Sequence, residues 1–94
     1  MARDVRITMA IDEGGELNIY LNEAGRDLLL KELQHLSEQS DHSHFGTWEG
    51  AEVELCAIPY RPTDRIIDAA KISLRPDEWD RQHYPHVLSG RAAR

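Results

Sequence analysis

Apolar residues recur at every second position near the start of the chain. The recurring positions are Val5, Ile7, Met9 and Ile11, and then Leu17, Ile19 and Leu21. A period of two predicts half-buried strands. Gly14 and Gly15 separate the two runs, and glycines supply the positive φ angles that a tight turn requires. We therefore expect a β-hairpin over residues 5–21.

The pattern becomes helical after residue 22. The apolar stripe consists of Leu29, Leu30, Leu33 and Leu36. Polar and charged residues occupy the rest of the circumference, which is typical of an amphipathic helix. Asn22 is suited to capping the first turn, and Glu23 places a negative charge where it suits the helix dipole. We expect one helix over about residues 23–38, long enough to cross one face of a sheet.

The second half of the chain returns to alternation. Short strands are expected to open at residues 42–45, to run over 51–57 and to run over 66–74. Prolines at 59 and 62 favour a stiff loop, and Pro76 favours the start of a helical turn. The order β-β-α-β-β-β predicts a single α+β domain over residues 1–89, with an antiparallel sheet and one helix packed across one face. Residues 90–94 are expected to form a flexible tail.

Charge is distributed unevenly along the chain. The formal net charge is −6. Residues 12–54 hold eleven acidic residues against two basic ones, which predicts an acidic face and argues against nucleic acid as the main partner. The sequence has no apolar run long enough for a membrane helix and no apolar leader, and it has one cysteine. We therefore expect a cytoplasmic protein with no membrane association.

Residues with catalytic chemistry do not form a recognisable motif. Cys56 lies within a predicted strand, whereas an activated thiolate needs a helix N-terminus or a nearby cation. We expect Cys56 to be structural and the protein to be neither an enzyme nor cofactor-dependent.

The histidines are the residues best suited to a metal. His42 and His44 would share one face of a strand beside Asp41, and imidazole and carboxylate groups are zinc ligands. His83 or His86 could complete the shell. The alternative is that these histidines hydrogen-bond within a polar loop or face solvent.

Aromatic and acidic residues gather in the predicted loops and strand of the middle segment. The predicted protein-binding residues are Trp48, Glu49, Glu52, Glu54 and Tyr60. Aromatic side chains combine large apolar area with a polar group, which suits an interface, and the carboxylates suit a basic partner. The alternative is that the aromatic residues close the ends of a small core.

Residues 17–45 contain a strand, the Asn22-Glu23-Ala24-Gly25 lead into a leucine-rich helix, and the segment from Asp41 to Phe45, in which His42-x-His44 is the most specific element. This combination resembles the small immunity proteins of bacterial polymorphic toxin systems. The loop over 59–62 and the segment after Pro76 have no counterpart in that family. The resemblance implies a non-catalytic protein that binds and neutralises a cognate toxin.

Two other functions remain open at this stage. One is a small metal-binding protein or metal-dependent enzyme built around His42 and His44. The other is a homodimeric accessory protein that pairs edge strands.

Overall fold

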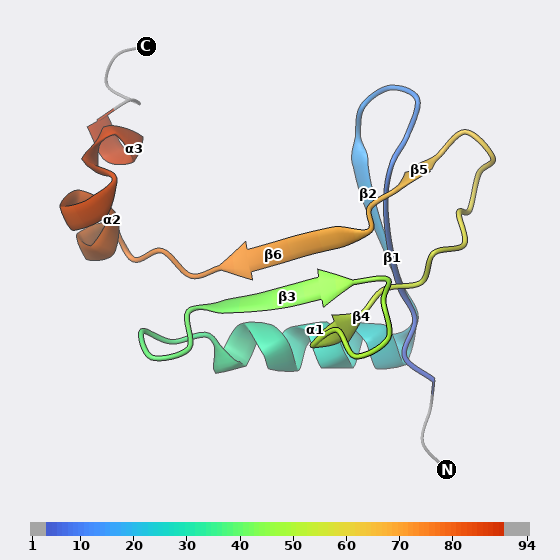
Figure 1. Cartoon of the computed structure of the whole chain (residues 1–94), viewed down its shortest axis with the longest axis horizontal. Coiled ribbons are helices and arrows are strands. Elements are labelled where there is room, and N and C mark those ends of the chain that lie inside the picture. Colours follow the sequence, from blue (N-terminus) through green and yellow to red (C-terminus); the bar gives the residue numbers. More distant parts are fainter. Residues whose placement is uncertain (1–3, 90–94) are drawn as a thin grey trace.

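The computed structural model describes residues 4–89. Within them the elements follow one another as β1 (Ile7–Ile11), β2 (Leu17–Leu21), α1 (Glu23–His35), β3 (His42–Gly46), β4 (Val53–Glu54), β5 (Arg65–Ile66), β6 (Ala69–Ser73), α2 (Asp77–His83) and α3 (Pro85–Ser89) (Figure 1). The expected α+β class is confirmed. The predicted tail at 90–94 lies outside the described residues.

The strands form two three-stranded sheets instead of the single sheet expected. One has the order β2-β1-β5 and is antiparallel throughout. The other has the order β4-β3-β6, in which β3 is antiparallel to β6 and parallel to β4. The second sheet is therefore mixed.

Two segments cross from one sheet to the other, which explains the short strands. The Leu55 amide donates to the Gly46 carbonyl and the next amide, of Cys56, donates to the Ile7 carbonyl, at 2.7 Å each. The expected strand over 51–57 is thereby reduced to β4. Similarly, the Ile67 amide donates to the Met9 carbonyl at 2.9 Å before the chain joins β3 as β6, so the expected strand over 66–74 is divided.

Asn22 joins the hairpin to the helix as a cap. Its Oδ1 accepts from the Gly25 amide at 2.7 Å and from the Arg6 amide at 3.0 Å. The helix ends at His35, earlier than expected, because Leu36 adopts an extended conformation with ψ of 133°. Backbone hydrogen bonds between Ser37 and Ser40, 3.0 and 3.2 Å long, then close a turn.

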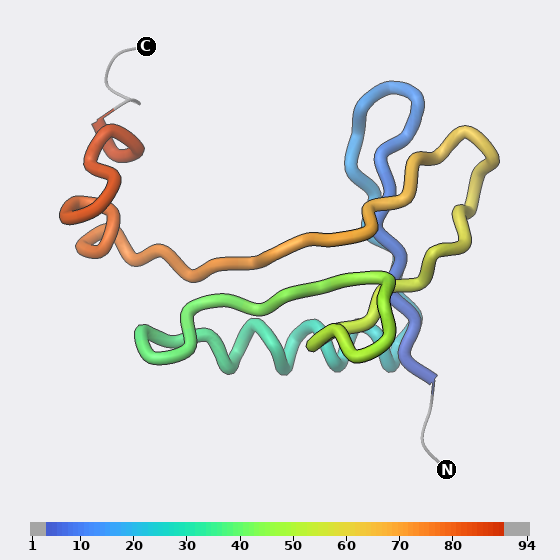
Figure 2. Tube along the Cα trace, viewed as in Figure 1, coloured from blue at the N-terminus to red at the C-terminus, as the bar shows by residue number. Residues whose placement is uncertain are grey.

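The core lies where α1 and the two sheets meet. Its buried residues are Ile7, Met9, Phe45, Val53 and Leu55, and Leu28 and Leu29 of α1 pack against them. The expected leucine stripe is only partly covered, since Leu30 and Leu33 are 54% and 46% exposed. The chain extends 44 × 35 × 21 Å, with α2 and α3 at the end of the molecule opposite the hairpin (Figure 2).

The Asp12 carboxylate closes the hairpin turn. Its Oδ1 accepts from the Gly14 and Glu16 amides at 2.9 Å each, and its Oδ2 accepts from Asn18 Nδ2 at 3.2 Å. The hydrogen bond from the Glu16 amide, followed by that from Asn18, lowers the pKa of Asp12 below its usual value of 3.8. The turn therefore favours the ionised carboxylate.

The lowered pKa of Asp12 predicts a pH-dependent turn. Because the pKa is lowered by folding, its contribution to stability is fully present above 3.8 and is lost as the pH falls through the folded-state pKa. Asp12→Ala is expected to lower the melting temperature by a few degrees at neutral pH and by less in strong acid, whereas Glu13→Ala changes it little. An NMR titration of the Asp12 carboxyl carbon tests this, and a midpoint at or above 3.8 would contradict it.

Candidate protein-binding site

The connection between β3 and β4 presents Trp48 on a fixed backbone. The Thr47 amide donates to the Asp68 carbonyl at 3.0 Å, and the Thr47 hydroxyl donates to Asp68 Oδ1 at 3.2 Å. The indole ring of Trp48 fills the space that a Cβ at Gly46 would occupy. Trp48 nevertheless remains 50% exposed, so it combines a defined position with an accessible apolar surface.

Two glutamates hold the same connection in place. Glu52 Oε1 accepts from the His44 amide at 2.8 Å, and Glu54 Oε2 accepts from the Gly50 amide at 3.0 Å. Hydrogen bonds to an ionised acceptor are stronger than neutral ones. Gly50 has a φ of +92°, which glycine adopts without strain. The carboxylates thus have ordered positions while both residues remain exposed.

A hollow with three acidic residues in its lining lies beside this connection. It has a volume of about 460 Å³ and is lined by Asp4, Val5, Leu28, Ala51, Glu52 and Glu54. Within residues 4–89, none of the three acidic side chains in this set forms an ion pair with a base. We call these six residues the acidic hollow. It combines three acidic side chains with three apolar ones.

The N-terminal side of the acidic hollow is positioned by the helix cap. Asn22 Nδ2 donates to the Asp4 carbonyl at 2.8 Å, and the Asn22 amide donates to the Arg6 carbonyl at 3.1 Å. One side chain therefore caps α1 and fixes the segment that brings Asp4 toward Glu52. Sequence reasoning identified the cap but missed Asp4 and Leu28, because their approach depends on how the two sheets meet.

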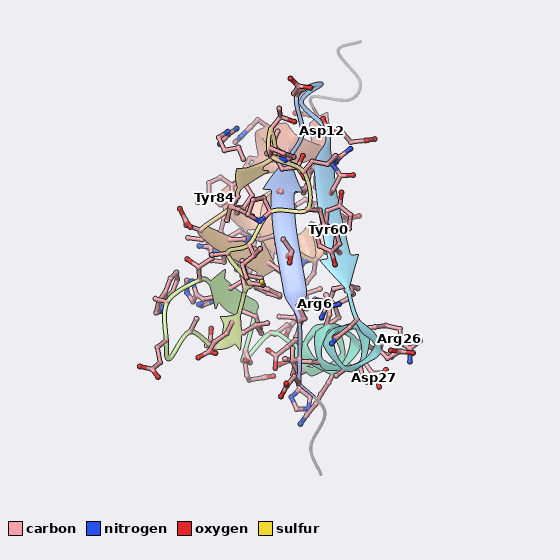
Figure 3. All side chains as sticks on the ribbon, turned by 90° about the vertical axis from the view of Figure 1, so that its right-hand side faces the viewer. Arg6, Asp12, Arg26, Asp27, Tyr60 and Tyr84 are labelled. Atoms are coloured by element: carbon pink, nitrogen blue, oxygen red, sulfur yellow. The ribbon has the colours of Figure 1, made fainter. Side chains whose placement is uncertain are left out.

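Tyr60 does not join this surface. Its ring stacks on that of Tyr20 with centroids 4.0 Å apart and an interplanar angle of 18°. Arg61 Nη2 donates to the Tyr20 hydroxyl at 3.0 Å. Figure 3 shows Tyr60 on the outer side of β1, between the labelled Arg6 and Asp12. Of the five predicted residues, Glu52 and Glu54 line the acidic hollow. Trp48 and Glu49 lie on the β3–β4 connection outside its lining, and Tyr60 lies elsewhere.

The histidines form a pair rather than a larger cluster. The rings of His42 and His44 lie 5.0 Å apart, and His42 Nδ1 is 2.8 Å from Asp41 Oδ1. The hydrogen bond with His42 lowers the pKa of Asp41. His83 instead packs against Trp79, with ring centroids 4.3 Å apart. Among the described residues no group of three or more His, Cys, Asp or Glu side chains is arranged to hold a metal ion, so the metal site rests on the pair alone.

Neither a membrane-spanning helix in the described residues nor a similar known protein was found. In the part of the chain that the structure describes, every helix is too short or too polar to cross a membrane. Comparison of this sequence and structure with protein-family models, curated proteins and solved structures found no match.

Proposed function

We propose that this chain is a non-catalytic protein-binding module that recognises a basic protein surface. The acidic hollow carries the proposal, because its three acidic residues line the same hollow as apolar side chains and form no ion pair with a base within residues 4–89. A basic side chain with a long apolar stem can cover Val5 and Leu28 and pair its charge with the carboxylates of the same hollow. Trp48 adds an exposed aromatic surface on the same connection, a residue type enriched among those that dominate binding energy.

The partner class follows from the resemblance of residues 17–45 to toxin-system immunity proteins. A nuclease toxin is a basic partner, because its cleft must attract phosphate. Negative charge on the binding module would then accelerate encounter and cover that cleft. The function proposed is neutralisation of such a toxin by direct binding.

Co-expression tests the proposed function. We expect the product of the adjacent reading frame to arrest growth alone, and this chain to restore growth and to co-purify with that product. If the neighbouring product is harmless and nothing co-purifies, the toxin-neutralising function is contradicted.

The same complex gives a kinetic test of the two glutamates of the acidic hollow together with Glu49, which lies outside its lining on the β3–β4 connection. The triple variant Glu49→Gln, Glu52→Gln and Glu54→Gln keeps the side-chain oxygens that hold the connection but removes three charges. We expect its association rate constant, measured by stopped flow at low salt, to fall about tenfold or more, and the salt dependence to weaken.

A matched control variant removes the same number of negative charges elsewhere on the surface. Glu13→Gln, Glu16→Gln and Glu38→Gln remove three exposed carboxylates away from the acidic hollow. This control is expected to change the association rate far less. Equal effects of the two triple variants would show that only total charge matters and would contradict a specific site.

A further inference from the structure

The inner face of the hairpin is only half covered. Leu17, Ile19 and Leu21 of β2 stand opposite Ile11, Met9 and Ile7 of β1 in the ladder, so they share the face that carries the core. The β1 residues Ile7 and Met9 are buried, but Leu17, Ile19 and Leu21 are 51%, 46% and 39% exposed. Since β2 is also an edge strand, these three residues form an uncovered apolar surface, here called the hairpin face.

The C-terminal arm, residues 75–89, carries exposed apolar side chains on helices that have few contacts with the rest of the chain. Its helices α2 and α3 pack mainly on each other, with the rings of Trp79 and Tyr84 5.5 Å apart. Tyr84 and Val87 remain 48% and 54% exposed. Figures 1 and 2 show that β6 separates the arm from the hairpin. The hairpin face and the C-terminal arm therefore both expose apolar side chains, and they do not contact each other within one chain.

The local geometry holds the arm away from its own hairpin. Arg75 lies over the Trp79 ring at 4.3 Å and places Nη1 3.5 Å from Asp41 Oδ2. The Leu74 amide donates to the Asp41 carbonyl at 2.7 Å. Pro76 restricts the residue before it to an extended conformation. Folding the arm back onto the hairpin of the same chain would require these contacts to break.

The exposed area of the chain matches the requirement of a dimer. The radius of gyration is 16.0 Å, against about 12 Å for a compact chain of this length. The accessible surface is 7002 Å², against about 5,500 Å² for a monomer of this mass. The difference is about 1,500 Å², and a stable interface takes about 800 Å² from each partner.

We propose that two copies of this chain form a two-fold symmetric dimer in which the arm of each copy covers the hairpin face of the other. Such an exchange uses the same pair of surfaces twice and closes without leaving either one free. The acidic hollow belongs to neither surface, so the dimer and the proposed toxin binding are independent.

Molar mass is the first test of the dimer. Light scattering during size-exclusion chromatography is expected to give twice the chain mass of 10.8 kDa. Ile19→Lys and Val87→Lys are each expected to give monomers, whereas Ile58→Lys, at a residue 73% exposed on neither surface, remains dimeric. Circular dichroism confirms that each variant is folded. A folded wild-type chain that stays monomeric throughout the micromolar range would overturn the proposal.

Cross-linking distinguishes arm exchange from other dimers. Two chains with different tags, both carrying Cys56→Ser, receive Ile19→Cys and Val87→Cys respectively and are mixed with a bismaleimide. We expect a mixed cross-linked product as the main species. A dimer that cross-links between two Ile19→Cys chains and gives no mixed product would show edge-strand pairing and would overturn the exchange.

Discussion

Phe45→Ala is expected to cost about 3–5 kcal/mol of unfolding free energy, the range for removing a buried phenylalanine ring. Phe45 is fully buried and pairs with Val53 of β4 on one side and Ala70 of β6 on the other. It belongs to the same cluster as Ile7 and Met9, so it joins the two sheets. A small domain has a total stability near the low end of about 5–15 kcal/mol. The variant is therefore expected to retain only about 0–2 kcal/mol of stability.

Urea unfolding followed by circular dichroism measures this loss. The melting temperature should also fall by about 12 °C or more. Phe45→Leu retains much of the volume and should cost less, and Ile58→Ala, on an exposed side chain, should stay within about 0.5 kcal/mol of wild type. All variants must be measured at the same protein concentration, because association adds to the apparent stability. A loss below about 1 kcal/mol for Phe45→Ala would contradict the central position of this ring.

The hairpin and the helix start could be predicted because local chemistry determines them. Alternation at Ile7 and Leu17, with glycines between, specifies two strands and a turn, and the structure has them at Ile7–Ile11 and Leu17–Leu21. Asn22 was expected to cap the helix and does so through Oδ1. These features depend on residues close together in the sequence. The fold class follows from them.

The division into two sheets could not be predicted from the pattern. Alternation over residues 51–57 indicates a strand but does not specify its partner or direction. The direction of β4 depends on hydrogen bonds to Gly46 and Ile7, which are far apart along the chain. Likewise, β1 was expected to be half-buried, but Thr8 and Ala10 are fully buried, because the segment after β4 covers their side of the hairpin.

The part of the candidate site that could be predicted from the sequence lies between β3 and the end of β4. Glu52 and Glu54 are close in sequence and both line the acidic hollow, whereas Trp48 lies outside its lining. Tyr60 was placed with them because it also lies in a loop, but its stacking on Tyr20 has no sequence signal. Asp4 was missed for the converse reason, since its approach to Glu52 requires the tertiary structure.

Gly25→Ala is expected to destabilise the protein although alanine is the better helix former. Gly25 is buried in the first turn of α1. A Cβ there would lie 2.5 Å from the Arg6 carbonyl oxygen and 3.0 Å from Ile7 Cγ1. The carbonyl belongs to a backbone that cannot rotate away, so α1 must move. Overpacking costs about 1–3 kcal/mol, and the close approach to a backbone oxygen favours the upper end of that range. A helix-propensity gain of at most about 1 kcal/mol then leaves a net loss of about 2 kcal/mol.

Gly25→Ala should also disturb the acidic hollow. This second effect distinguishes the expected movement of α1 from a general loss of stability. Moving α1 away from Arg6 stretches the hydrogen bonds through which Asn22 holds Arg6 and Asp4. Amide chemical shifts are therefore expected to change at Asp4 and Leu28, in addition to the fall in stability by urea unfolding. Gly14→Ala, where a Cβ would meet only Asp12 Oδ1 at 3.5 Å, should change stability by less than about 1 kcal/mol. If Gly25→Ala were as stable as wild type, the close packing of α1 on β1 would be wrong, and the cap could not position Asp4 as proposed.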